Sequence, residues 1–203
     1  MKIIVVYLAI MAVIVPPMWA NHGRDPRQSV LLLEILDADG VKLGSGSCYV
    51  IAHKGDWWYA ATAKHCVEDA SGWLADGHKA ELVRKDPDAD VAMIRFKAPD
   101  ESYTVLQLAD PEIGEVCTAV GWAGDTFVQY KGFVVGINFK VGDDKHVVAN
   151  SGLFPGCSGG PLLNSSGEVI GTTSAVAARG AIFDSTGLFV PVKYIRAMLP
   201  LIE

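Results

Sequence analysis

Three short segments of this sequence bring together the residue types of nucleophilic catalysis. His65 follows an apolar run, Asp90 comes directly before another, and Ser158 lies in the glycine-rich stretch P-G-C-S-G-G-P. A serine hydroxyl is a poor nucleophile until an imidazole accepts its proton, and that imidazole needs a carboxylate to hold its tautomer and stabilise its charged form. The three segments therefore predict a general base at His65, an orienting acid at Asp90 and a nucleophile at Ser158.

The glycines around Ser158 fit the same chemistry. Gly156 and Gly159 let the backbone take turn conformations that side chains disfavour, and they let a substrate approach closely. The N–H groups of Gly156 and Ser158 are then predicted to point together at a developing oxyanion. The alternative for Asp90 is a turn residue after Pro87, because aspartate is common in turns. Asp86 and Asp88 are the rival orienting acids.

The elements that must position these residues are predicted to be β-strands. The chain has 203 residues, of which 50% are hydrophobic and 20% charged, and this composition excludes a disordered or collagen-like chain. Short apolar runs alternate with turn residues, at 29–36, 41–52, 57–62, 80–84, 91–96, 103–108, 116–121, 127–139, 146–149, 161–163, 169–175 and 188–192. The intervals leave little room for crossover helices, so the sheets are predicted to be antiparallel. Residues 192–202 have helical spacing, and 111–114 make a junction between two halves.

Charge and ligand chemistry exclude several classes of partner. The formal net charge is −6, and the chain has no run of Lys or Arg that would neutralise phosphates, so nucleic acid is not an expected partner. A metal site would have to gather Cys48, His65 and Cys66 without the usual spacing of metal ligands, so neither a metal nor another cofactor is expected.

The N-terminus resembles a targeting segment. Lys2 is followed by an unbroken apolar stretch at 3–15, which has the length of a signal-peptide core but is short for a bilayer span. We predict a signal peptide over 1–20, cleavage near Ala20 and export of the rest to the periplasm or beyond. Met18 is large for its position before the cleavage site, so an uncleaved membrane anchor over 3–20 is the alternative.

The three catalytic segments also resemble a known family, the chymotrypsin-fold, trypsin-like serine peptidases. T-A-K-H-C is similar to the family's T-A-A-H-C, D-V-A-M-I to its Asp-x-Ala-aliphatic-aliphatic segment, and G-C-S-G-G-P to its G-D-S-G-G-P. The stretch PGCSGGPLLNSSGEVIGTTSA resembles the bacterial HtrA-type branch more closely still. The resemblance implies an all-β fold of two antiparallel six-stranded β-barrels, roughly 28–108 and 112–191, with a C-terminal helix packed on the second. The corresponding domains are 21–110, with His65 and Asp90, and 111–203, with Ser158.

The resemblance also implies an activity. It predicts a serine endopeptidase that hydrolyses peptide bonds through an acyl-enzyme, acts on peptide or protein substrates and is a monomer. No PDZ domain is expected after the helix, so an oligomeric chaperone is not implied. The alternative is a protease-like binding or scaffold protein without turnover, which the unusual Cys157 beside the oxyanion hole keeps open. Cys157 is also a rival nucleophile, although in viral relatives the nucleophilic cysteine directly precedes Gly-Gly, where Ser158 stands here.

Substrate-binding positions follow from the same alignment. Ser174, Ala175 and Val176 fall where family members offer a strand edge to the substrate backbone. Gly152 corresponds to the base of the specificity pocket and Gly187 to its far wall. Neither glycine brings a charge, so cleavage is expected after uncharged residues, small to medium aliphatic ones first and aromatic ones second.

Four cysteines complete the candidate residues, namely Cys48, Cys66, Cys117 and Cys157. An even number in an exported chain permits two disulfides with three possible connectivities. The family's partner positions for Cys66 and Cys117 are occupied here by Gly46 and Asn164. The resemblance therefore leaves Cys48–Cys66 and Cys117–Cys157 as the first expectation.

Overall fold

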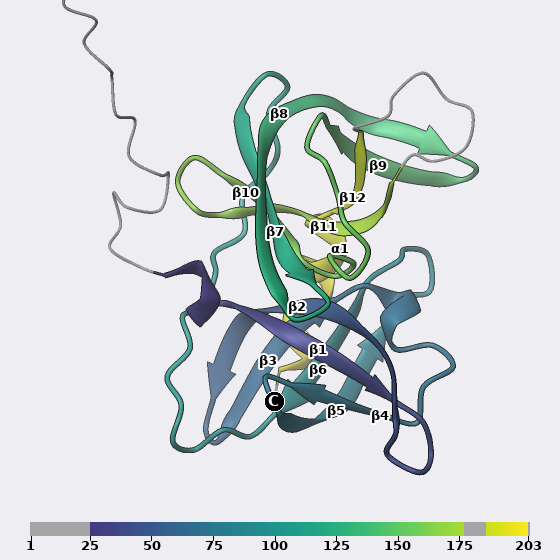
Figure 1. Ribbon diagram of the computed structural model, residues 1–203. Coiled ribbons are helices and arrows are strands. Elements are labelled where there is room, and N and C mark those ends of the chain that lie inside the picture. The colour runs from purple at the N-terminus through teal and green to yellow at the C-terminus, as the bar shows by residue number, and fades with distance from the viewer. Residues whose placement is uncertain (1–24, 177–185, 203) are drawn as a thin grey trace, which may run out of the picture.

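The structure is a computed structural model that describes residues 25–176 and 186–202. The expected signal peptide over 1–20, or membrane anchor over 3–20, lies outside the described residues. Two β-barrels lie one above the other and meet along a broad junction (Figure 1). Among the described residues, no helix is long and apolar enough to cross a bilayer.

The first barrel closes in the strand order β1-β2-β3-β6-β5-β4, and every neighbouring pair is antiparallel. Its strands are β1 (Val30–Leu36), β2 (Lys42–Lys54), β3 (Trp57–Thr62), β4 (Gly72–Ala75), β5 (His78–Lys85) and β6 (Ala92–Phe96). The 3₁₀-helix η2 (Pro26–Gln28) precedes β1, and η3 (Lys64–Cys66) follows β3.

The second barrel closes in the order β10-β11-β12-β9-β8-β7, again with antiparallel neighbours. Its strands are β7 (Val116–Ala123), β8 (Thr126–Val141), β9 (Asp144–Ala149), β10 (Pro161–Asn164), β11 (Val169–Val176) and β12 (Gly187–Pro191). The predicted all-β fold of two six-stranded antiparallel barrels is confirmed.

One predicted strand does not form, and the structure contains one strand that the sequence pattern does not predict. The run 103–108 is not a strand but part of the connection between the barrels, with one isolated bridge from Leu108 to Val169. Its backbone groups bond instead to several elements, for example from the Leu106 amide to the Val50 carbonyl at 2.9 Å. The strand that completes the first barrel is β4, whose four residues are too short to show an alternating pattern in the sequence.

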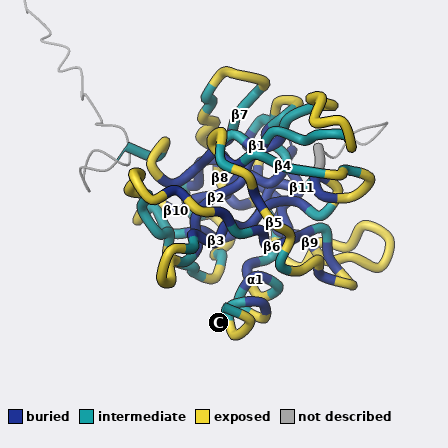
Figure 2. The backbone as a smooth tube through the Cα atoms, turned by 90° about the horizontal axis from the view of Figure 1, so that it is seen from below, coloured by how far each residue is buried: buried dark blue, intermediate teal, exposed yellow. Residues whose placement is uncertain are grey.

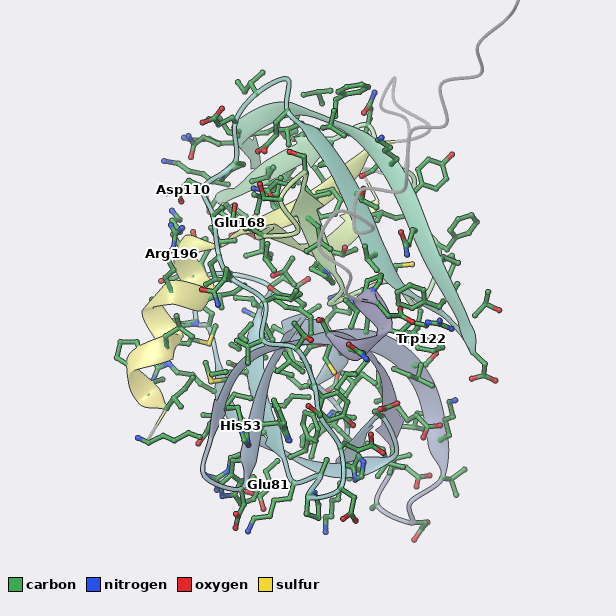
Figure 3. All side chains as sticks on the ribbon, turned by 90° about the vertical axis from the view of Figure 1, so that its left-hand side faces the viewer. His53, Glu81, Asp110, Trp122, Glu168 and Arg196 are labelled. Atoms are coloured by element: carbon green, nitrogen blue, oxygen red, sulfur yellow. The ribbon has the colours of Figure 1, made fainter. Side chains whose placement is uncertain are left out.

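The C-terminal helix is shorter than predicted and packs differently. α1 spans Lys193–Met198, and the 3₁₀-helix η4 (Leu199–Leu201) follows it. The α-helix ends where Pro200 cannot donate a backbone hydrogen bond. Ile195 and Met198 of α1 join a core cluster that holds residues of both barrels, so the helix packs across their junction rather than on the second barrel alone. Figure 3 shows Arg196 of this helix beside Asp110, with which it forms an ion pair.

Three buried clusters hold the fold together. One fills each barrel, and the third joins the two, with Tyr49 and Met93 from the first barrel packed against Val120 and Val190 from the second. Figure 2 shows the buried stretches in the middle of the molecule and the exposed ones mainly at the turns around it. The junction is therefore an apolar core that fixes one barrel against the other.

Candidate active site

The antiparallel pairing of β3 and β6 brings His65 and Asp90 together. Thr62, the last residue of β3, pairs with Ala92, the first residue of β6, so the chain leaving one strand and the chain entering the other emerge at the same edge. His65 lies in η3 just beyond that edge, and its Nδ1 is 2.8 Å from Oδ2 of Asp90. The backbone amide of His65 also donates to Oδ1 of Asp90 at 2.9 Å. Both carboxylate oxygens therefore hold the histidine, through its ring and its backbone.

The two side chains shift each other's pKa in opposite directions. Burial by itself raises the pKa of Asp90, but the hydrogen bonds from the His65 ring, Ser174 and the His65 amide outweigh it and hold that pKa below its usual range. The hydrogen bond to Asp90 raises the pKa of His65 above its ordinary value, and contact with the Cys66 thiol adds to that, against the opposing effect of burial. The pair is therefore most stable as carboxylate and imidazolium.

The rival acids are occupied elsewhere. Asp86 is buried, and its Oδ1 accepts from the amide of Asp88 at 2.9 Å, which closes the turn that leads to Asp90. Asp88 is exposed. The amino group of Lys64 donates to the Asp86 carbonyl at 3.1 Å. Asp90 is the candidate acid whose carboxylate meets His65.

Ser158 lies in a tight turn before β10, held against the first barrel. Its carbonyl accepts from the amide of Ser47 on β2 at 2.8 Å, and the Cys66 thiol lies 3.8 Å from the same oxygen. The next residue, Gly159, has φ +84°, and a Cβ there would lie 2.3 Å from the Thr62 hydroxyl oxygen. Only glycine fits so close to the end of β3. The segments that carry Ser158 and His65 thus pack directly against each other across the two barrels.

The amides predicted for an oxyanion hole lie on this turn. Gly156 has φ +96°, a conformation suited to glycine, and a Cβ there would lie 2.6 Å from the Trp122 carbonyl oxygen. The intervening amide of Cys157 donates to the Phe154 carbonyl at 3.0 Å. Within the described parts of the chain, neither the Gly156 amide nor the Ser158 amide donates to a protein acceptor. Among the described residues, the Gly156 and Ser158 amides are therefore left without an acceptor, while the Cys157 amide between them has one.

Ser174 has a structural role beyond the predicted one. The pairing of β11 with β12 shifts register between Thr173 and Ala175, so Ser174 is the extra residue of a β-bulge. Its hydroxyl donates to Oδ2 of Asp90 at 2.5 Å. Bulges of this kind redirect a side chain next to a site. Beyond Ser174, residues 175–176 continue along β12 with their pairing to Leu188 and Gly187.

The two glycines expected in the specificity pocket lie against apolar groups. A Cβ at Gly152 would be 2.9 Å from the Tyr130 ring. One at Gly187 would be 2.7 Å from the Phe189 ring and 3.1 Å from Leu153. These contacts leave no space for a side chain at either glycine, and none of the contacting groups is charged.

The expected disulfides are wrong for this structure, in which all four cysteines are free and buried. Cys117 lies in the core of the second barrel, whereas Cys157 belongs to the turn against the barrel junction, so the two do not share a cluster. Cys48 and Cys66 share the core of the first barrel, but the Cys66 thiol is directed at the Ser158 carbonyl.

Burial also bears on the choice of nucleophile. It raises the pKa of the Cys117 thiol to about 12 and raises the pKa of Cys157 as well. A buried thiol with a raised pKa is a poor nucleophile. Cys157 is 4% exposed, whereas its neighbour Ser158 is partly exposed, and this favours Ser158 over Cys157.

Known proteins resemble this chain in sequence and in fold. Residues 46–171 match the family model described as a trypsin-like peptidase domain. The chain is 31% identical over 160 residues to a probable periplasmic serine endoprotease DegP-like of Chlamydia trachomatis, covering 72% of this chain and 31% of that protein. It is 31% identical over 170 residues to the periplasmic serine endoprotease DegP of Salmonella typhimurium, covering 76% and 34%.

A solved structure, the HtrA-type protease AlgW with tripeptide, superposes with a TM-score of 0.76 at 22% identity, covering 93% of this chain and 64% of that one. That likeness supports the fold. The chain spans about a third of the length of the two curated relatives.

Proposed function

The chain belongs to the family of trypsin-like peptidase domains, and from this premise we propose that it is a serine endopeptidase of HtrA type that uses His65, Asp90 and Ser158 as a catalytic triad. The observation that carries the proposal is the contact of 2.8 Å between His65 Nδ1 and Asp90 Oδ2. The turn that contains Ser158 packs against the segment that contains His65. The chemistry that these residues support is acyl transfer.

In the proposed reaction His65 takes the proton of the Ser158 hydroxyl while the serine oxygen attacks the carbonyl carbon of the substrate. The amides of Gly156 and Ser158 stabilise the oxyanion that forms. When this intermediate collapses, the peptide C–N bond breaks and His65 passes its proton to the leaving amine. Water then attacks the acyl-enzyme by the same route and releases Ser158. Asp90 stabilises the imidazolium in both halves.

The substrate we propose is an extended peptide segment. The edge of β11 at Ser174–Val176 offers backbone groups for β-augmentation, with main-chain hydrogen bonds for affinity and pockets for alternate side chains. We further propose that the chain is exported. The apolar stretch at 3–15 and the periplasmic names of the relatives support that localisation.

Labelling with a fluorophosphonate probe tests the proposal, because the probe reacts only with an activated serine. The wild-type chain should be labelled and should cleave an unfolded protein substrate. Ser158→Ala should lose both, whereas Cys157→Ala, which removes the neighbouring thiol, should keep the label. A folded wild-type chain that does not react with the probe would instead support the scaffold protein without turnover.

A further inference from the structure

Ser47 is a buried serine of the first barrel whose hydrogen bonds reach the turn of the second barrel. Its amide donates to the Ser158 carbonyl at 2.8 Å, and its hydroxyl donates to the Gly156 carbonyl at 3.0 Å. The same hydroxyl oxygen accepts from the amide of Trp122 at 2.8 Å, and the Ser47 carbonyl accepts from the Thr62 hydroxyl at 2.8 Å. Ser47 itself is 0% exposed.

The direction of the hydroxyl hydrogen follows from these partners. The Trp122 amide can only donate, so it uses a lone pair of the Ser47 oxygen. The single hydroxyl hydrogen is then left for the Gly156 carbonyl, which can only accept. A Cβ at Gly121 would lie 2.9 Å from the Ser47 oxygen, so the site has little spare space. Figure 3 shows Trp122 at the level where the two barrels meet.

These bonds fix two peptide planes of the turn, one on each side of the Cys157–Ser158 peptide that carries the Ser158 amide. The plane that joins Gly156 to Cys157 is held at its carbonyl by Ser47 and at its N–H by the Phe154 carbonyl at 3.0 Å. The plane that joins Ser158 to Gly159 is held at its carbonyl by Ser47 and at its N–H by the Thr173 carbonyl at 2.8 Å. Each plane is therefore fixed at both of its polar ends.

We propose that Ser47 is a positioning residue for the oxyanion hole, which keeps the Gly156 and Ser158 amides aimed at the reacting carbonyl. This inference rests on the proposed peptidase function. Ser47 does not touch the substrate and acts through the turn. Fixed donors stabilise the transition state more than donors that must first reorient, so the effect belongs to kcat rather than to KM.

Ser47→Ala removes the hydroxyl and leaves the Gly156 carbonyl and the Trp122 amide without this partner. Loss of one oxyanion donor costs about 10²–10³ in kcat, and disordering such donors should cost less, about 10–100-fold. KM should stay within about twofold, because ground-state binding does not use the oxyanion. Affinity for a peptide aldehyde, whose adduct with Ser158 places an oxyanion in the hole, should fall by the same factor as kcat/KM.

Tyr49→Phe is the matched control. The Tyr49 hydroxyl forms a buried hydrogen bond of 2.7 Å with the Thr172 hydroxyl, which also joins the two barrels but does not touch the turn. Both variants should unfold at lower denaturant concentration than the wild type. Only Ser47→Ala should lose kcat and aldehyde affinity in parallel.

Ser47→Cys provides a second variant of similar shape. Its weaker S–H donor should give losses between those of wild type and Ser47→Ala, and it keeps the test decisive if the alanine variant fails to fold. If the serine variants match Tyr49→Phe in kcat and in aldehyde affinity while the wild type is labelled by fluorophosphonate, the inference about Ser47 is overturned and the peptidase assignment stands. A folded wild type that is not labelled overturns both.

Discussion

The hydroxyl of Ser174 on the second barrel donates a hydrogen bond of 2.5 Å to the Asp90 carboxylate on the first barrel. The same carboxylate oxygen lies 2.8 Å from the His65 ring. Asp90, the proposed orienting acid, is thus held by both barrels, and the geometry of the proposed base His65 depends on how the barrels pack together. Packing at the junction is therefore coupled to the candidate site.

Ser174→Ala tests that coupling, since it removes one hydrogen bond to Asp90 and leaves the backbone of β11 in place. We expect a loss of about 1–2 kcal/mol in the free energy of unfolding at pH 7, because the carboxylate is partly exposed and water replaces some of the lost bond. A comparable loss in transition-state stabilisation gives about a tenfold drop in kcat/KM. Urea denaturation and peptide-cleavage kinetics measure the two effects. Unchanged stability and rate would show that this hydrogen bond is not formed in solution.

Substitutions of the triad should be far more severe and should not add up. Ser158→Ala and His65→Ala should each reduce kcat by about 10⁴-fold or more, and the double variant should be no worse, because the two residues act as a unit. Asp90→Asn should cost about 10³–10⁴-fold, since an amide favours the wrong tautomer of His65. Asp88→Asn, in the same turn, is the control that should retain activity. Retained turnover in Ser158→Ala would refute the nucleophile assignment.

The pH profile of kcat/KM should follow the titration of His65. Activity needs the neutral imidazole, so the rate should rise with pH through the pKa of His65, which the Asp90 hydrogen bond raises above its usual value of about 6.5. Asp90→Asn should move the rise to lower pH. Lys64→Ala should leave it nearly unchanged, because the lysine donates to the Asp86 carbonyl. A rate that is flat from about pH 5 to 9 would point to a different base.

The same shifts set the pH dependence of folding. The pKa of His65 is higher in the folded chain than its value of about 6.5 in the unfolded chain, so His65 stabilises the fold fully below about pH 6.5. This contribution is lost as the pH rises through the pKa of His65 in the folded chain. Asp90, whose pKa is lowered, contributes above its unfolded value of about 3.9 and loses that contribution in acid. The pair therefore stabilises the fold most between about pH 4 and 6.5, so stability and activity should have different optima.

Local patterns predicted antiparallel strands and the three catalytic segments, whereas the arrangement of the strands in two barrels came from the resemblance to the peptidase family. Alternating apolar residues and turn glycines define strands, and the residues around His65, Asp90 and Ser158 are each contiguous. What the sequence missed depends on contacts far apart in the chain. The strand β4 is identified only by its pairing with β1 and β5, and the hydrogen bond from Ser174 depends on a bulge that local sequence does not specify.

The cysteines show the same limit. Their number suggested bridges, but whether two thiols meet depends on which core each one enters. We expect four titratable thiols in the denatured chain without reductant, and very slow reaction of all four in the folded chain, because each is buried. Ellman's reagent with and without denaturant measures both. Two thiols fewer in the denatured chain would show that a disulfide forms.

The expected specificity pocket also predicts which residue precedes the cleaved peptide bond. The groups that a side chain at Gly152 or Gly187 would contact are the rings of Tyr130 and Phe189 and the side chain of Leu153, and none of them carries a negative charge that would neutralise a cation. A desolvated Lys or Arg side chain without a partner is strongly disfavoured, so cleavage should follow uncharged residues, small to medium aliphatic ones first and aromatic ones second. The buried Ser151 hydroxyl, which has no hydrogen-bond partner among the described residues, adds a polar group next to Gly152 but no charge.

Profiling on a mixed peptide library measures this preference directly. Gly152→Asp supplies the contrasting variant: in a folded chain, a carboxylate at the base of the pocket should raise relative cleavage after Lys and Arg. Because a Cβ at this position would lie 2.9 Å from the Tyr130 ring, the change should be combined with Tyr130→Ala to make space. Tyr130→Ala alone should keep the uncharged preference. Dominant cleavage after Arg or Lys by the wild-type chain would show that Gly152 is not the base of the pocket.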